Sequence, residues 1–213
     1  MPVFGRRAII HRALPADLTP EAITPSSLHN QFVGTIGTRI DVTYGTTLDL
    51  DIEGVTDSMK KGTLLHRAFE VLAGHPDRAD ILSDAVGKAL THGQVSSIVT
   101  AVGAFDCWLD KYLRPQAIHS EVPLLTLNSE GTIVSGFADM VVEAADGLWI
   151  VDHKSDQIST DYILQERFNT YYPQVKCYAD ALQTARSDKP VRGVILNWVS
   201  YGKVSLMESV HGL

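Results

Sequence analysis

Two neighbouring segments of this chain read as β-strands joined by a tight turn, and this pair constrains the fold more than any other feature. The segments are "TIVSGFADMVVEA" (residues 132–144) and "LWIVDHK" (residues 148–154), and "ADG" lies between them. A glycine-containing turn between two apolar segments of period two is typical of a β-hairpin. The chain must therefore build a sheet here, and the hairpin decides which residues of the two strands become neighbours.

The second strand of this hairpin ends on an acid and a lysine. Side chains alternate along a strand, so Asp152 and Lys154 share one face, while Trp149, Val151 and His153 share the other. An isolated Asp-x-Lys at a strand end is usually a solvated ion pair. Only partners from elsewhere in the chain give the pair a chemical meaning.

Asp139 lies on the first strand of the hairpin, so its carboxylate and that of Asp152 can meet at one edge of the sheet. Two adjacent carboxylates repel, and one is driven to bind a proton unless a cation lies nearby. Oxygen ligands of this kind suit Mg²⁺ or Mn²⁺ better than zinc. We expect His66, from an upstream helix, and the backbone carbonyl of His153 to complete such a metal site.

Lys154 would then lie beside the attacking water, where an ammonium group can orient the water and balance negative charge on a phosphorane-like transition state. Gln174 and Tyr178 are four residues apart on a predicted helix, so they share a face and can contact a phosphate backbone or brace Lys154. Taken singly, each of these residues is more often structural. Only the whole group predicts phosphodiester chemistry.

Apolar stripes at helical spacing predict three helices before the hairpin. They run from Asp57 to a stop at Gly74–Pro76, from about Pro76 to Thr91, and from about Val95 to Leu113. These stripes are typical of a core and not of cofactor contacts.

Around and after the hairpin the pattern predicts further strands over residues 118–127, 191–200 and 203–210. A helix is predicted over residues 171–186, with Pro173 near its start, where proline is tolerated. This order of elements favours an α/β fold with a central mixed β-sheet flanked by helices.

Residues 1 to about 30 carry four prolines in a polar stretch that cannot hold a long helix, apart from a short one through Leu28 and Phe32, capped by Ser26 or Ser27. The glycine-rich stretch that follows has no firm assignment. We therefore expect residues 1–55 to form a lead-in or linker, and residues 56–213 to form one domain.

Composition bounds the class of protein. With 213 residues, 45% of them hydrophobic, the chain can bury one good core. Its net charge of −7 argues against a broad basic DNA-binding face, but leaves room for a narrow metal site to which another module delivers nucleic acid.

Cys107 and Cys177 form no ligand pair and are expected to be reduced, buried thiols. No apolar run is long enough to cross a membrane, so a cytoplasmic protein without a membrane partner is expected.

The segments "GTLLHRAFE", "GFADMVVE", "VDHKSD" and "QVKCYADAL" resemble, in order and spacing, the successive motifs of RecB-type nuclease domains in the PD-(D/E)XK superfamily. The resemblance spans Gly62 to about Leu182 and is closest to the C-terminal nuclease modules of RecB-like and AddA-like helicase–nucleases. It implies a restriction-endonuclease-like core. Ala138 stands where the superfamily name has proline, and "DHK" replaces the more usual "DYK".

This resemblance implies a role for each residue. His66, Asp139, Asp152 and the carbonyl of His153 would bind Mg²⁺ or Mn²⁺, Lys154 would be catalytic, and Gln174 and Tyr178 would support the site. Iron–sulfur relatives need four cysteines, and this chain has two.

No "GxxxxGK[ST]" motor motif occurs in the sequence. The resemblance therefore predicts a DNA nuclease domain that cuts single strands supplied by a helicase motor, in the same chain or complex, during double-strand break repair. The alternative is a module that binds DNA or a partner and has kept the nuclease fold without its activity.

Overall fold

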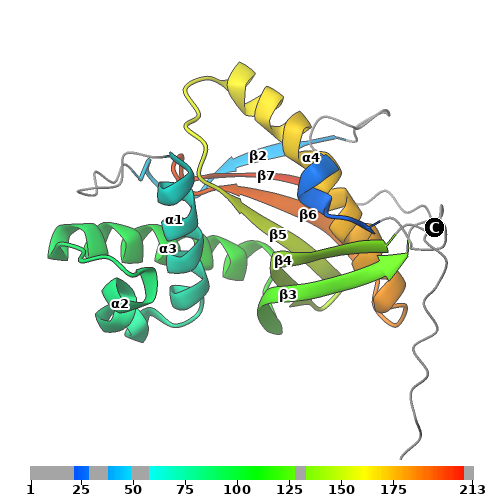
Figure 1. Ribbon diagram of the computed structural model, residues 1–213, viewed down its shortest axis with the longest axis horizontal. Coiled ribbons are helices and arrows are strands. Elements are labelled where there is room, and N and C mark those ends of the chain that lie inside the picture. The colour runs from blue at the N-terminus through cyan, green and yellow to red at the C-terminus, as the bar shows by residue number, and fades with distance from the viewer. Residues whose placement is uncertain (1–21, 29–37, 49–57, 128–132, 209–213) are drawn as a thin grey trace, which may run out of the picture.

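The computed structural model describes residues 22–28, 38–48, 58–127 and 133–208 (Figure 1). Its strands are β1 (Ala22–Ile23), β2 (Ile40–Thr43), β3 (Ala117–Leu127), β4 (Ile133–Ala144), β5 (Gly147–Lys154), β6 (Val191–Trp198) and β7 (Lys203–Glu208). Its α-helices are α1 (Ser58–Leu72), α2 (Leu82–Val86), α3 (His92–Tyr112) and α4 (Asp161–Ala185), and two 3₁₀ helices are η2 (Pro25–Leu28) and η3 (Pro76–Ile81).

All seven strands belong to one mixed sheet. The strand order is β1-β4-β5-β6-β7-β2, and β3 pairs with β4. The β5/β6 and β1/β4 pairs are parallel, and the other pairs are antiparallel. The predicted hairpin is β4–β5, with Met140 opposite Val151. The sheet and its flanking helices confirm the predicted fold class.

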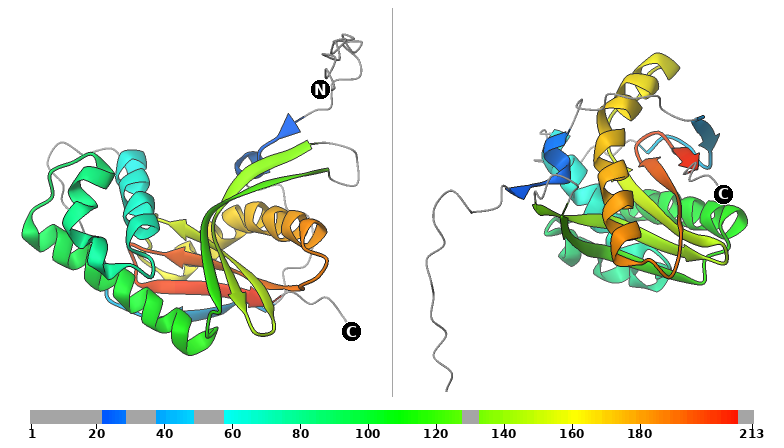
Figure 2. Two further views of the ribbon diagram at one scale, coloured as in Figure 1. Left: turned by 90° about the horizontal axis from the view of Figure 1, so that it is seen from below. Right: turned by 90° about the vertical axis from the view of Figure 1, so that its right-hand side faces the viewer.

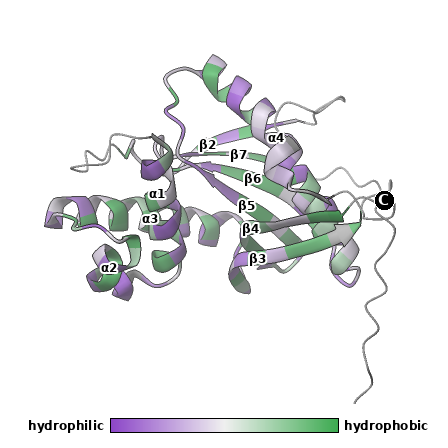
Figure 3. Ribbon diagram, viewed as in Figure 1, coloured by the Kyte–Doolittle hydropathy of each residue, from purple (hydrophilic) through white to green (hydrophobic). Residues whose placement is uncertain are grey.

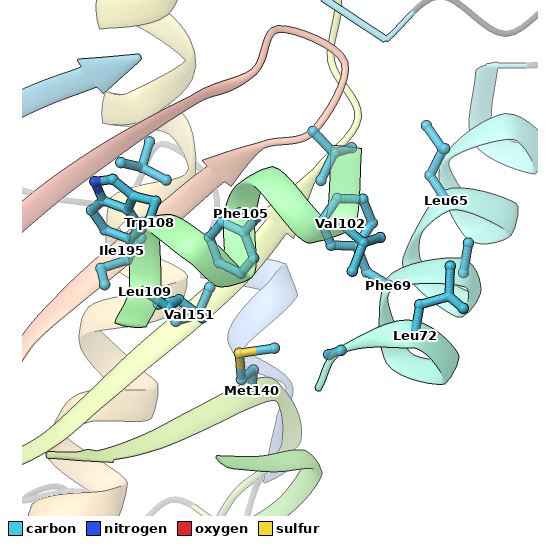
Figure 4. Close-up of a cluster of buried hydrophobic side chains, with 14 of the residues drawn as sticks. Leu65, Phe69, Leu72, Val102, Phe105, Trp108, Leu109, Met140, Val151 and Ile195 are labelled. Carbon is cyan, nitrogen blue, oxygen red and sulfur yellow. The ribbon is translucent and has the colours of Figure 1, made fainter. Parts of the chain in front are cut away.

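Helices cover both faces of this sheet, and Figure 2 shows α3 and α4 on opposite sides of it. Trp149 and Val151 of β5 pack into one cluster with α1 and α3, as Figure 4 shows for Val151, Phe69 and Phe105. Leu148 and Ile150 point the other way and pack against α4. In Figure 3 the strand is hydrophobic in colour until its C-terminal end, which turns hydrophilic next to α1. The polar end of β5 thus lies between two apolar layers.

The helices before the hairpin follow the prediction with one change. The segment expected as a single helix from Pro76 to Thr91 is η3 followed by α2, and it ends at Gly87, whose φ of 65° stops the helix. Helix α3 then begins at His92, because the Thr91 hydroxyl accepts from the Gln94 backbone N–H and Gln94 returns the bond.

Helix α4 starts ten residues before the predicted start at Tyr171, at Asp161. The side chain of Thr160 caps it by accepting from the Ile163 backbone N–H at 3.2 Å. Pro173 therefore lies inside the helix and not near its start, and the burial of Leu164, Phe168 and Tyr172 against the sheet holds the helix together around it.

Part of the expected lead-in contributes to the sheet. Strand β2 pairs with β7, and β1 pairs with β4. The short helix η2 begins at Pro25 and contains Ser26 and Ser27, whereas Phe32 lies outside the described residues. The domain boundary at residues 55–56 stays a prediction.

Both cysteines are free, but Cys107 is exposed, contrary to the expected burial, because it lies on the outward face of α3. Cys177 is half-buried. Within the described ranges, no helix has the length and apolar character that a membrane span requires.

Candidate functional site

The C-terminal end of β5 brings an acid and a lysine together inside the protein. Asp152 is only 2% exposed, and its Oδ2 lies 2.7 Å from Lys154 Nζ. Alternation along the strand aims both side chains at α4, where Lys154 Nζ also donates to Gln174 Oε1 at 3.1 Å. The ring of Tyr171, one turn earlier on α4, lies 4.4 Å from the same ammonium group. Lys154 is therefore held by a carboxylate, an amide oxygen and an aromatic face.

Gln174 connects this lysine to Tyr178. Its Nε2 donates to the Tyr178 hydroxyl at 3.3 Å, while its Oε1 accepts from Lys154. Tyr178 approaches β4 closely at Gly136, where a Cβ would lie 3.1 Å from Cε1 of the Tyr178 ring. The Gln-x-x-x-Tyr pair thus braces the lysine, one of the two contacts expected from its helical spacing.

Asp139 faces α1 from β4. Its Oδ2 accepts from the backbone N–H of His153 at 2.8 Å and lies 3.4 Å from Nδ1 of His66. Helix α1 therefore brings His66 to Asp139, and the backbone of β5 holds the Asp139 carboxylate by a hydrogen bond.

The carboxylates of Asp139 and Asp152 repel each other when both are charged. Burial, and then the charge of Asp152, raise the pKa of Asp139 well above its ordinary value. Burial lowers the pKa of His66, which favours the neutral imidazole, the form that binds a metal. Oδ2 of Asp152 is buried without a directed hydrogen bond, although the Lys154 ammonium is close. A divalent cation would supply the missing positive charge.

Two of the predicted metal ligands, His66 and Asp139, are paired with each other, whereas Asp152 is paired with Lys154, which is not a ligand. Among the described residues, no group of three or more His, Cys, Asp or Glu side chains is close enough together to hold an ion. A hollow of about 10 Å³ lies against His66 and Asp139, which is room for about one water-sized particle. The donor types fit Mg²⁺ or Mn²⁺, and the complete ligand set stays a prediction.

The side chain of His153 points away from the acid and the lysine, as alternation predicts, and it is part of the core. It is 3% exposed, and its Nδ1 lies 2.9 Å from Nδ2 of Asn197, which makes Nδ1 the acceptor. The Tyr44 hydroxyl donates to Oδ1 of Asn197, and the ring of Phe69 lies 4.9 Å from the imidazole. Burial lowers the pKa of His153 to about 3, so it is neutral. Any contact with a metal is left to its backbone carbonyl, which stays a prediction.

Glu121 is an acid of this region that the sequence analysis did not select. It lies on β3 opposite Asp139, between the pairs Ser120–Met140 and Val122–Ala138, and it lines the same small hollow. Its φ of 51° is unusual for a residue other than glycine, and burial raises the pKa of its carboxyl. The available signal was an acid inside the predicted strand over residues 118–127, which comes directly before the strand of Asp139.

A comparison with protein-family models agrees with this architecture. A family model described as "PD-(D/E)XK nuclease superfamily" matches residues 43–205, which is more than half of the chain. Among solved structures, "Crystal structure of SSO0001" is similar at 13% sequence identity and a TM-score of 0.33, over 75% of this chain and 69% of that chain. No curated protein matches the sequence.

We expect His153→Phe to fold but to lose about 1–3 kcal/mol of unfolding free energy, because the buried Asn197 amide loses its acceptor. Denaturant unfolding measures this change. The matched control is His119→Phe, since the His119 side chain is 50% exposed on β3 and its loss should change stability by less than about 0.5 kcal/mol. Equal stabilities of the two variants would contradict the role given to His153.

We expect Asp139→Asn to raise the melting temperature in EDTA at neutral pH, because it removes a buried charge that Asp152 repels. A raised carboxyl pKa means that the native state binds the proton more tightly than the unfolded state. The wild-type protein should therefore gain stability as the pH falls toward that pKa, and the Asn variant should lack this gain. Asp146→Asn, on a carboxylate 58% exposed, is the control. A lower melting temperature for Asp139→Asn would contradict the repulsion.

Proposed function

Because this chain belongs to the PD-(D/E)XK nuclease superfamily, we propose that it hydrolyses phosphodiester bonds in DNA with the help of Mg²⁺ or Mn²⁺. The observation that carries the proposal is the position of Lys154, whose ammonium group lies 2.7 Å from the buried carboxylate of Asp152. A lysine held beside an acid at the end of a central strand is suited to a reaction in which negative charge builds up on phosphate.

We assign the metal to His66, Asp139, Asp152 and the backbone carbonyl of His153. When bound, the ion supplies a Lewis acid for the phosphate and for the attacking water. The neutral state favoured for His66 and the 3.4 Å distance between its Nδ1 and Oδ2 of Asp139 support this assignment.

The roles of the remaining residues follow from their contacts. Lys154 balances the charge on the phosphate and orients the water. Gln174 keeps the lysine at the reacting group, since its amide oxygen accepts from Nζ at 3.1 Å and its amide nitrogen is tied to Tyr178. Gln174 and Tyr178 are therefore positioning residues in this proposal.

We further propose that a helicase motor, in the same chain or in a complex, supplies single-stranded DNA during double-strand break repair. A net charge of −7 leaves little general attraction for a polyphosphate, so a motor that threads the strand would provide the high local concentration that the surface does not. A non-catalytic module with the same fold is the alternative, and it would have no need for the pairing of Asp152 with Lys154.

We expect Lys154→Ala and Asp152→Ala each to lower cleavage by about 100-fold or more, which is the typical loss when a charge-stabilising group is removed. Labelled single- and double-stranded DNA with Mg²⁺, Mn²⁺ or EDTA provides the assay. Lys176→Ala is the matched control, because that lysine lies on the surface of α4, paired with Asp180 at 2.7 Å.

Calorimetric titration with Mn²⁺ separates the two roles. Asp152→Ala should weaken metal binding, while Lys154→Ala should largely spare it, since an ammonium group is not a ligand. Wild-type cleavage in either variant would remove the assignment. An equal loss of metal binding in both would contradict the separate roles.

For the motor we expect the 213-residue chain alone to bind DNA weakly at near-physiological salt, and to lose that affinity quickly as salt rises. A titration of labelled single strands at several salt concentrations measures both properties. Tight and salt-resistant binding would mean that the chain is a self-sufficient nuclease, and the tethered arrangement would be wrong.

A further inference from the structure

A second hollow, of about 680 Å³, lies next to the proposed catalytic centre. Its walls come from the segment that joins β5 to α4, from the first turns of α1 and from α4, which lie around that segment in Figure 1. Tyr171 belongs to both places, because it lines this hollow and its ring lies 4.4 Å from Lys154 Nζ. A ligand in the hollow would therefore be the immediate neighbour of a group bound at Lys154.

The walls carry the chemistry that recognises a nucleotide. Lys61 and Arg167 supply two positive charges, and Asp156 supplies one negative charge. That acid already has partners inside the protein, since it accepts from the Tyr171 hydroxyl at 3.0 Å and lies 3.3 Å from Arg167 Nε. Arg167 is itself the partner of that acid, so these three side chains leave one net positive charge at the hollow, in a chain of net charge −7. Cations for a phosphate beside an aromatic face for a base form the usual single-strand platform.

The size of the hollow limits how many nucleotides it can take, and its aromatic wall favours unpaired bases. A volume of about 680 Å³ is that of an ordinary small-molecule pocket, which is enough for about one or two nucleotides. Bases that are paired and stacked inside a duplex present no free face to Tyr171, whereas an unpaired base can stack on an aromatic ring.

We propose that this hollow binds the nucleotide next to the scissile phosphodiester, with its base on Tyr171 and its phosphate near Arg167 and Lys61. The inference rests on the proposed nuclease function and adds the place where the nucleotide next to the cut binds. The protein would select single strands because only an unpaired base can stack on Tyr171, whatever supplies the strand.

Binding in EDTA tests this proposal apart from cleavage. We expect a short fluorescein-labelled thymidine oligonucleotide to bind more tightly than a duplex of equal length. Tyr171→Leu should weaken single-strand binding by about 5- to 150-fold, the range for the loss of one stacked base. Tyr171→Phe, which keeps the ring, should retain most of the affinity. Tyr162→Leu, on the same helix at a position 71% exposed and outside the hollow, is the control.

The charge contact has its own matched pair of variants. The side chains of Arg167 and Arg192 are both 49% exposed, and each is paired with an aspartate. Arg167→Gln should reduce the salt dependence of binding by about one counterion, and Arg192→Gln should leave it unchanged.

Two results would overturn the proposal: duplex bound as tightly as single strand, or unchanged binding in both Tyr171→Leu and Arg167→Gln with normal melting curves. The proposed function fails separately. If single strands bind through Tyr171 but no metal produces cleavage, the hollow stands as a binding site and the nuclease activity is wrong. If DNA is cut while both variants behave as wild type, the reverse holds.

Discussion

The contact between Asp152 and Lys154 is the interaction on which the rest of this structure depends. A carboxylate that is 2% exposed is strongly unfavourable unless a positive charge lies beside it, and the ammonium group at 2.7 Å provides that charge. Lys154 in turn needs its own partners, which are the Gln174 amide and the Tyr171 ring on α4. The packing of α4 on the sheet and the chemistry proposed for β5 are therefore parts of one arrangement.

The opposite face of β5 buries a polar side chain, that of His153. His153 is aimed into the core between α1 and α3, and it is tolerated there because Asn197 satisfies one ring nitrogen while aromatic rings surround the rest. Its backbone N–H donates to Asp139 at 2.8 Å, so the backbone of β5 also orients the first aspartate. The packing of both faces thus fixes the end of β5, which carries Asp152 and Lys154 and lies beside Asp139 of β4.

Local patterns in the sequence predicted the parts of the site that lie on one element. The turn at "ADG" predicted the β4–β5 hairpin, alternation predicted the shared face of Asp152 and Lys154, and helical spacing predicted that Gln174 and Tyr178 lie together. The start of α4 was missed because "DYILQERFNT" is mostly polar. Its inner face is marked only by Ile163, Leu164 and Phe168.

Non-local features could not be predicted in the same way. Strand β2 is recognisable only by its pairing with β7, more than 150 residues away, and Asn197 only by its contact with His153. The backbone conformation of Glu121, with a φ of 51°, is likewise not encoded by the spacing of residues. Convergence of side chains from different elements is a property of the packed chain, which explains why the members of the site could be chosen but their grouping into two pairs could not.

Strand β5 has no side that faces solvent, since seven of its eight residues are buried. Fold and chemistry therefore share the same short stretch of chain, and a substitution there acts on both. In a mutational scan, variants of β5 would fall below the folding threshold and lose turnover together, so a loss of turnover alone cannot identify a catalytic group on this strand. Turnover and the free energy of unfolding must therefore be measured on the same variant before any residue of this strand is called catalytic.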